Sequence, residues 1–162
     1  MAQRMITKPM SILAVDPGKA TGVAWIEVEP GTPAEIIDAY ETGGTLHETI
    51  AVFNTWNRAR RFAPAPLDIC EDWIAIDTEF VTQPALAIEP MAWLKMLASD
   101  AGIEIETPYP QQRLAFSDKV FHDSGYWHVG GAGHARSAIR HGLSWCLRQI
   151  HLPTMHKLVP RS

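Results

Sequence analysis

Residues 12–18, Ile-Leu-Ala-Val-Asp-Pro-Gly, decide the fold of this chain. The four apolar residues form a β-type run, and the Pro-Gly pair that follows Asp16 predicts a tight turn. A second apolar run over residues 23–28 comes directly afterwards, and residues 34–42 are interpreted as a third strand. The sequence therefore predicts an antiparallel meander of three strands, the first of which ends at Asp16.

The rest of the chain alternates between helices and strands. Thr45 and Glu48 match a capping box, which predicts a helix over residues 45–61, and residues 67–71 are typical of a short apolar strand. The later segments predict a loop over 82–90, a helix over 91–101 that ends at Gly102, a strand over 103–106, a short helix over 111–121 and a final helix over 134–151. This order predicts an α/β fold with a mixed five-stranded sheet flanked by helices.

Length and composition favour one ordinary globular domain. The chain has 162 residues, of which 46% are hydrophobic and 20% charged, a balance that excludes long disorder. No window approaches the ~20 apolar residues of a membrane span, and the N-terminus lacks the apolar core of an export signal. Cys70 and Cys146 are interpreted as buried free thiols, so we expect a cytoplasmic protein. We assign residues 1–156 to the domain and 157–162 to a vector-derived tail.

The charge of the chain does not decide between partners. The net charge of -4 counts against a general nucleic-acid coat, because phosphate binding usually rests on a basic surface. It does not exclude a metal-dependent nuclease, since clustered carboxylates lower the net charge while bound cations restore positive potential locally.

Two carboxylates follow apolar strands. A buried acidic residue such as Asp16 is costly unless it is compensated, and Mg²⁺ binding is one compensation; an ordinary turn Asp is the alternative. Glu71 repeats the pattern at the end of its own strand, where a solvent-exposed strand end would explain it equally well. If the two strands are neighbours, both side chains converge on one region of the sheet.

A third group of polar residues lies on the predicted final helix. His134, Ser137 and His141 are three, four and seven positions apart, which places them on one helical face, opposite the apolar stripe. His134 is a candidate metal ligand, and a polar residue at a helix start is the alternative.

Taken together, these segments resemble the RuvC family of Holliday-junction resolvases, in particular the short versions from phages of actinobacteria. The segments that carry the resemblance are residues 12–18 with Thr21-Gly22, residues 69–72 and residues 130–141. The similarity extends from about residue 11 to residue 150, and it implies a ribonuclease-H-like fold for a single nuclease domain.

The resemblance also implies a catalytic site. Asp16, Glu71 and His134 match the family's metal ligands, whereas Ser137 stands where the family has Asp, and neutral serine cannot supply the missing charge. Two Mg²⁺ or Mn²⁺ ions, ~4 Å apart, would hydrolyse phosphodiester bonds. The residues expected to contact DNA phosphates are Lys19, Arg113, Lys119, Arg136 and Arg140.

The family cuts two opposed strands of a four-way junction, so the resemblance implies a symmetric homodimer acting on branched DNA, in the host cytoplasm if it is phage-encoded. Other substrates of the same fold are flaps, replication forks or RNA in a hybrid. A non-catalytic protein that binds branched DNA is the second reading, motivated by Ser137. A nucleotide binder resembling sugar kinases also has an Asp-x-Gly turn, but such proteins are usually two-domain and much longer.

Overall fold

A computed structural model describes residues 5–18, 20–69, 82–106, 116–127 and 133–159. Its sheet has the order β3-β2-β1-β5-β6, and β4 pairs with β1 outside this path. The strands are β1 (Met10–Asp16), β2 (Ala20–Glu29), β3 (Thr32–Gly43), β4 (Ala63–Pro64), β5 (Leu67–Ile69) and β6 (Ile105–Glu106). The first three are antiparallel, and β1, β5 and β6 run parallel, so the sheet is mixed, as predicted.

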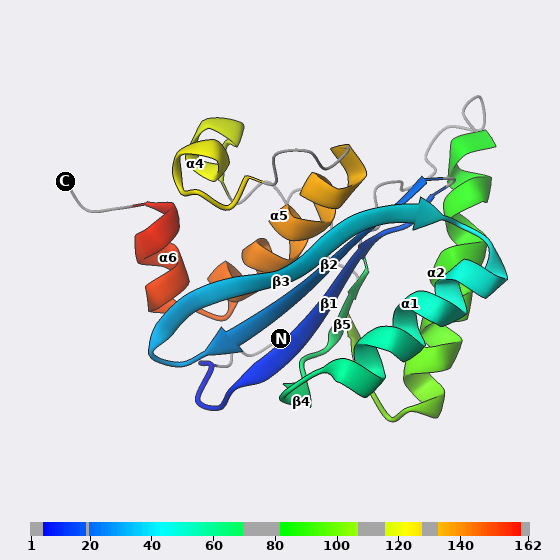
Figure 1. The fold of residues 1–162 in the computed structure, drawn as a ribbon, viewed down its shortest axis with the longest axis horizontal. Helices are drawn as coiled ribbons and strands as arrows, with labels where there is room; N and C mark the ends of the chain where they lie inside the picture. Colours follow the sequence, from blue (N-terminus) through cyan, green and yellow to red (C-terminus); the bar gives the residue numbers. More distant parts are fainter. Residues whose placement is uncertain (1–4, 19, 70–81, 107–115, 128–132, 160–162) are drawn as a thin grey trace.

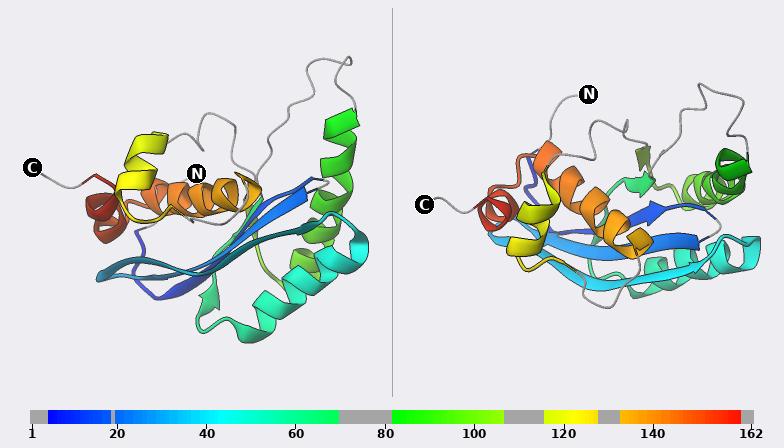
Figure 2. Two further views of the ribbon diagram at one scale, coloured as in Figure 1. Left: turned by 45° about the horizontal axis from the view of Figure 1, so that its top comes forward. Right: turned by 90° about the horizontal axis from the view of Figure 1, so that it is seen from above.

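Helices cover both faces of the sheet. They are α1 (Leu46–Ala59), α2 (Thr82–Asp100), α4 (Asp118–Asp123), α5 (Gly133–Arg148) and α6 (Leu152–Leu158). Helices α1 and α2 lie on one face, and α5, flanked by α4 and α6, lies on the other (Figures 1 and 2). The predicted α/β fold class is confirmed. No helix in the described part of the chain is long and apolar enough to cross a membrane.

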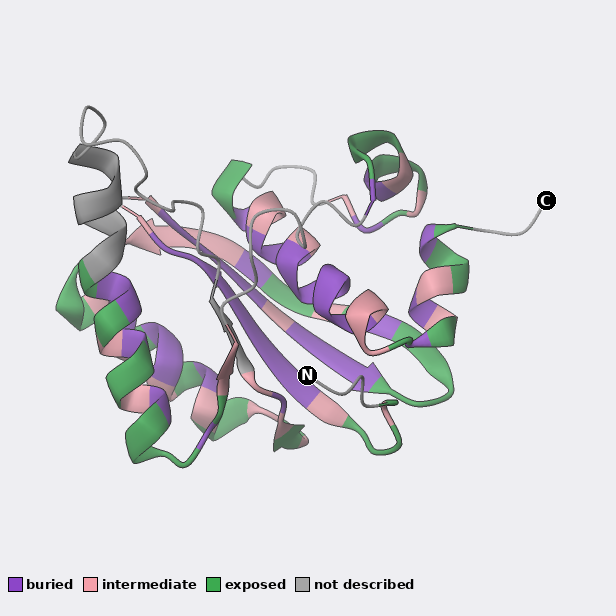
Figure 3. Cartoon of the chain, turned by 180° about the vertical axis from the view of Figure 1, so that it is seen from behind, coloured by how far each residue is buried: buried purple, intermediate pink, exposed green. Residues whose placement is uncertain are grey.

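The central strand β1 contributes to two cores. Ile12 and Ala14 pack on the α5 side, whereas Leu13 and Val15 pack on the side of α1 and α2. A strand covered on both faces is apolar throughout rather than alternating, and this explains the unbroken run before Asp16. Figure 3 shows the resulting band of buried residues along the middle of the sheet.

The sheet has six described strands, so the prediction of five was wrong in this detail. The extra strand is β4, in a segment that contains two prolines. It pairs with Met10 and Ser11, and the Ala65 N–H donates to the Ser11 carbonyl at 2.9 Å. Pro64 and Pro66 have no N–H to donate, but Ala65 between them has one. Its hydrogen bond to Ser11 holds this short strand beside β1.

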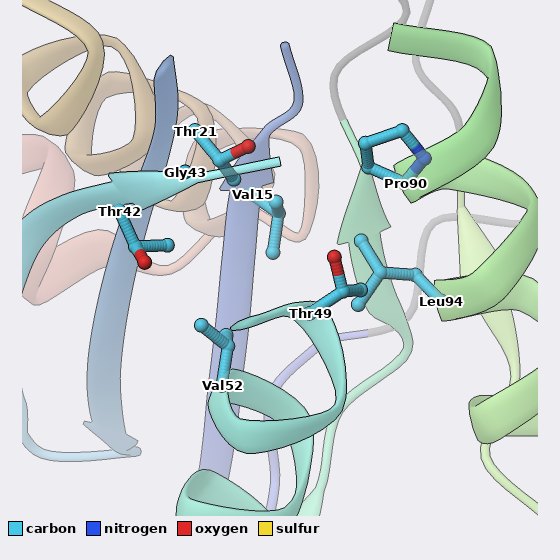
Figure 4. A pocket seen from close by; sticks show the side chains of 8 residues that line it. All are labelled: Val15, Thr21, Thr42, Gly43, Thr49, Val52, Pro90 and Leu94. Carbon is cyan, nitrogen blue, oxygen red and sulfur yellow. The ribbon is translucent and has the colours of Figure 1, made fainter. Parts of the chain in front are cut away.

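The start of α2 also differs from the prediction, which interpreted residues 82–90 as a loop. The helix begins at Thr82 and contains Pro90 in its interior. Pro90 and Leu94 line a small pocket together with Thr49 and Val52 of α1 (Figure 4). Packing of α2 against α1 and the sheet therefore outweighs the local preference of proline to end a helix.

The helix predicted over 134–151 corresponds to α5, and a further helix, α6, follows it beyond the predicted range. Helix α5 ends at Arg148, and Ile150, with φ of 55°, turns the chain into α6. Leu158, at the end of α6, is only 2% exposed in the core, so packed structure continues past the predicted boundary at residue 156. The vector origin of the last residues stays a prediction.

Candidate metal centre

One row of residues crosses three strands beneath the start of α5. Asp16 of β1 is the cross-strand partner of Gly22 of β2, and Gly22 is the partner of Glu41 of β3. Cross-strand partners project to the same face of a sheet. The next row inward, Ala14, Ala24 and Ala39, lies in the core on the α5 side, so the row from Asp16 to Glu41 faces α5.

His134, the second residue of α5, contacts all three members of this row. Its Nδ1 lies 3.1 Å from the Asp16 Oδ2, and its backbone N–H donates to the Glu41 Oε1 at 2.9 Å. Its carbonyl oxygen lies over Gly22, where an added Cβ would come within 1.9 Å. The side chain and the backbone of His134 are therefore positioned by three different strands.

The two side chains differ in their access to solvent. Asp16 is 4% exposed, whereas the His134 side chain is 52% exposed. Because a carboxylate only accepts hydrogen bonds, the contact with Asp16 places an imidazole proton on Nδ1, and in the neutral ring Nε2 then carries the lone pair. The positive end of the α5 dipole also favours the carboxylates of Asp16 and Glu41.

This pair fits part of a site for a divalent cation. Mg²⁺ prefers carboxylate oxygens, and Mn²⁺ accepts both oxygen and imidazole nitrogen. Over the residues that the structure describes, no group of three or more His, Cys, Asp or Glu could hold a metal. Strand β5 ends at Ile69, whose partner in β1 is Val15, and Glu71 lies outside the described residues. The structure thus brings together Asp16 and His134.

Ser137 and His141, the other residues predicted to lie on the polar face of α5, differ in their exposure to solvent. Ser137 lies one turn after His134 and is half-buried. His141 was predicted to lie on a polar face opposite the apolar stripe, and this was wrong, because it is only 2% exposed. Ser144 and Trp145, close to His141, are also buried. This side of α5 is therefore covered by the fold instead of facing solvent.

Three of the five basic residues predicted to contact DNA have partners in the described part of the chain. Arg140 forms an ion pair with Asp118 and lies over the rings of Phe116 and Phe121, so it attaches α4 to α5. Lys119 pairs with Asp123. The Arg136 guanidinium lies 4.6 Å from the centre of the Trp127 ring. Lys19 and Arg113 lie outside the described residues, and the assignment of all five to DNA binding stays a prediction.

Sequence reasoning missed Glu41. Its hydrogen bond joins residues 93 positions apart, and a charged residue in a strand with partly exposed neighbours carries no signal of such a contact. Gly22 lay in the Thr-Gly pair that carried the resemblance, but its close approach to α5 was not predicted.

Comparisons with known proteins support the fold from an independent direction. No protein-family profile matches the sequence, and no curated protein matches it. Among solved structures, Thermus thermophilus RuvC in complex with a Holliday junction substrate superposes with a TM-score of 0.68 at 13% identity, covering 90% of this chain and 97% of that chain. This chain has the RuvC fold.

A second structure of Thermus thermophilus RuvC gives a TM-score of 0.64 at 15% identity, covering 88% of this chain and 98% of that chain. At these identities the likeness establishes the RuvC fold alone. It agrees with the ribonuclease-H-like architecture predicted from the sequence, and it leaves the activity to be argued from the site.

Proposed function

We propose that this chain is a metal-dependent endonuclease that resolves four-way junctions or other branched DNA by phosphodiester hydrolysis. The observation that carries the proposal is the contact of His134 with the buried carboxylate of Asp16, at the end of the central strand of a RuvC fold. A buried carboxylate with an accessible imidazole beside it provides oxygen and nitrogen ligands at the same place.

The proposed site uses Asp16, Glu71 and His134 as ligands, with Ser137 one turn after His134 on α5. Two Mg²⁺ or Mn²⁺ ions would supply an activated water and stabilise the leaving 3′ oxygen, which gives products with 5′ phosphates. Asp16 contributes negative charge from a position closed to solvent. His134, held through Nδ1, presents Nε2 from its exposed ring.

Branched DNA is the proposed substrate because the similar Thermus thermophilus structure holds a Holliday junction substrate. Two opposed strands of such a junction require two active sites, so we propose a symmetric homodimer. We propose the cytoplasm as its location, that of the host cell if the protein is phage-encoded.

Ser137 favours a second candidate, a branched-DNA binding protein without nuclease activity. Serine is neutral, and its hydroxyl is a weak ligand compared with a carboxylate, so the site has one charge fewer than the resemblance predicts. This candidate keeps the fold and the substrate but excludes hydrolysis.

Cleavage assays distinguish these candidates. Labelled four-way junctions, flaps and RNA–DNA hybrids are incubated with the protein and Mg²⁺, then Mn²⁺, beside Asp16→Asn. Asp100→Asn is the matched control, because Asp100 is exposed at the end of α2 on the other side of the sheet. We expect cleavage of junctions that Asp16→Asn abolishes and the control retains.

Junction binding without cleavage in either metal would support the second candidate instead. In that case Ser137→Asp tests the cause, because a restored carboxylate would restore cleavage if the missing ligand is the defect.

A further inference from the structure

We propose that Glu41 is a positioning residue, which fixes the first turn of α5 and thereby holds the His134 imidazole against Asp16. Its carboxylate accepts the backbone N–H of His134 at 2.9 Å. Glu41 comes from β3, two strands away from Asp16. The effect on catalysis rests on the proposed function, but the structural effect does not.

The first step concerns the start of α5. The first N–H groups of a helix have no partner within the helix and need an acceptor from elsewhere. Helix α5 begins at Gly133, so the His134 N–H is one of these groups. Glu41 supplies the acceptor that an N-cap side chain usually provides, and its charge also suits the positive end of the helix.

The second step concerns the orientation of the first turn of α5. The His134 N–H is held on the β3 side and its imidazole on the β1 side, while Gly22 between them leaves room for the His134 carbonyl. Two attachments on opposite sides fix both the place and the rotation of the first helical turn. A catalytic group must keep its geometry to within about 0.5 Å, which an exposed helix start without this acceptor would not guarantee.

The third step concerns how Glu41 acts. Its Oε1 accepts the backbone N–H of His134, whereas the His134 ring contacts Asp16 and not Glu41. We therefore assign Glu41 a role that acts through the position of His134.

Two conservative variants separate hydrogen bonding from charge. Glu41→Gln keeps the length of the side chain and an acceptor oxygen but removes the charge. Glu41→Asp keeps the charge but withdraws the acceptor by one methylene. The matched controls are Glu35→Gln and Glu35→Asp, because Glu35 is an exposed residue of the same strand whose partner is Glu27, away from α5.

The main measurement is amide hydrogen exchange at His134 by NMR, in the protein without added metal. Glu41→Asp is expected to raise the exchange rate about tenfold or more, whereas Glu41→Gln changes it by less than about threefold. Both Glu35 variants are expected to exchange like the wild type. Because this measurement needs neither metal nor DNA, it stands even if the chain proves not to be a nuclease.

Mn²⁺ binding by calorimetry and junction cleavage add functional measurements. Glu41→Asp is expected to weaken Mn²⁺ binding and to lower kcat more than it changes KM. Glu41→Gln, which keeps the acceptor oxygen, is expected to bind Mn²⁺ and to cut junctions like the wild type. Unchanged exchange in Glu41→Asp would overturn the proposal. So would a larger defect in Glu41→Gln than in Glu41→Asp, because charge and not the hydrogen bond would then be responsible.

Discussion

His134 is the residue at which the fold and the proposed chemistry meet. Its ring is within 3.1 Å of a carboxylate that is almost closed to solvent, and a buried charge of this kind requires compensation. The imidazole and the start of α5 provide part of that compensation here. The same contacts hold His134, at the start of α5, over the row of residues from Asp16 to Glu41.

Gly22 gives a prediction at the scale of the residue. An added Cβ would come within 1.9 Å of the His134 carbonyl oxygen, so Gly22→Ala must displace the start of α5. We expect a loss of about 1–3 kcal/mol of stability in urea unfolding, together with a loss of metal-dependent cleavage. Gly31→Ala is the control, since its Cβ would meet nothing within 4 Å. Equal stability of the two variants would contradict the close approach.

Arg61 gives a second prediction at this scale. Glu27 is 3% exposed and pairs with Arg61 at 3.2 Å. Arg61→Ala leaves a buried carboxylate without this cation, so we expect the free energy of unfolding to fall by about 1–3 kcal/mol. Arg58→Ala, at an exposed position near the end of α1, is expected to change it by less than about 0.5 kcal/mol. Thermal unfolding of both variants gives the comparison.

At the scale of the element, α6 is attached to the β2–β3 hairpin by a buried polar network. His151 Nε2–H donates to the Glu29 carbonyl and its Nδ1 accepts from Thr154, both at 2.7 Å. The Thr154 hydroxyl oxygen accepts the Ala34 N–H at 2.9 Å. These bonds offset the strained backbone of Ile150, whose φ of 55° costs about 1–3 kcal/mol.

This network predicts a dependence of stability on pH. Burial lowers the pKa of His151, so the folded protein favours the neutral ring that the network requires. The contribution to stability is present above the unfolded pKa of about 6.5 and is lost as the pH falls through the lower folded pKa. Urea unfolding at several pH values should show this loss. It should be smaller in His151→Gln than in the control His156→Gln, because His156 is exposed.

Elements differed in how far the sequence could predict them. The meander and α1 follow from local chemistry, since Pro and Gly mark the turns and the Thr45 side chain caps α1 by accepting the Glu48 N–H, as predicted. The start of α2 was not predictable in this way. Residues 82–90 contain two prolines, and the second of them, Pro90, lies inside the helix and lines a pocket with residues of α1, a contact that a local pattern does not contain.

At the scale of the whole molecule, the three-layer arrangement places Asp16 and His134 together although they are 118 positions apart. Both residues were predicted, Asp16 from its place after an apolar strand and His134 from the resemblance. Glu41 was not predicted, because its role exists only after β3 and α5 have packed. The sequence therefore predicted the two side chains that the fold brings together, and their role in a metal site stays a prediction, but only the assembled fold shows the contact of Glu41 with His134.

The most direct test of the central claim is the pattern of nicks in a labelled four-way junction incubated with Mn²⁺. We predict paired nicks, placed symmetrically in two opposed strands, and their absence in Asp16→Asn under conditions where both proteins bind the junction. Nicks that persist in Asp16→Asn, or a junction that is bound but never cut by the wild type, would contradict the claim.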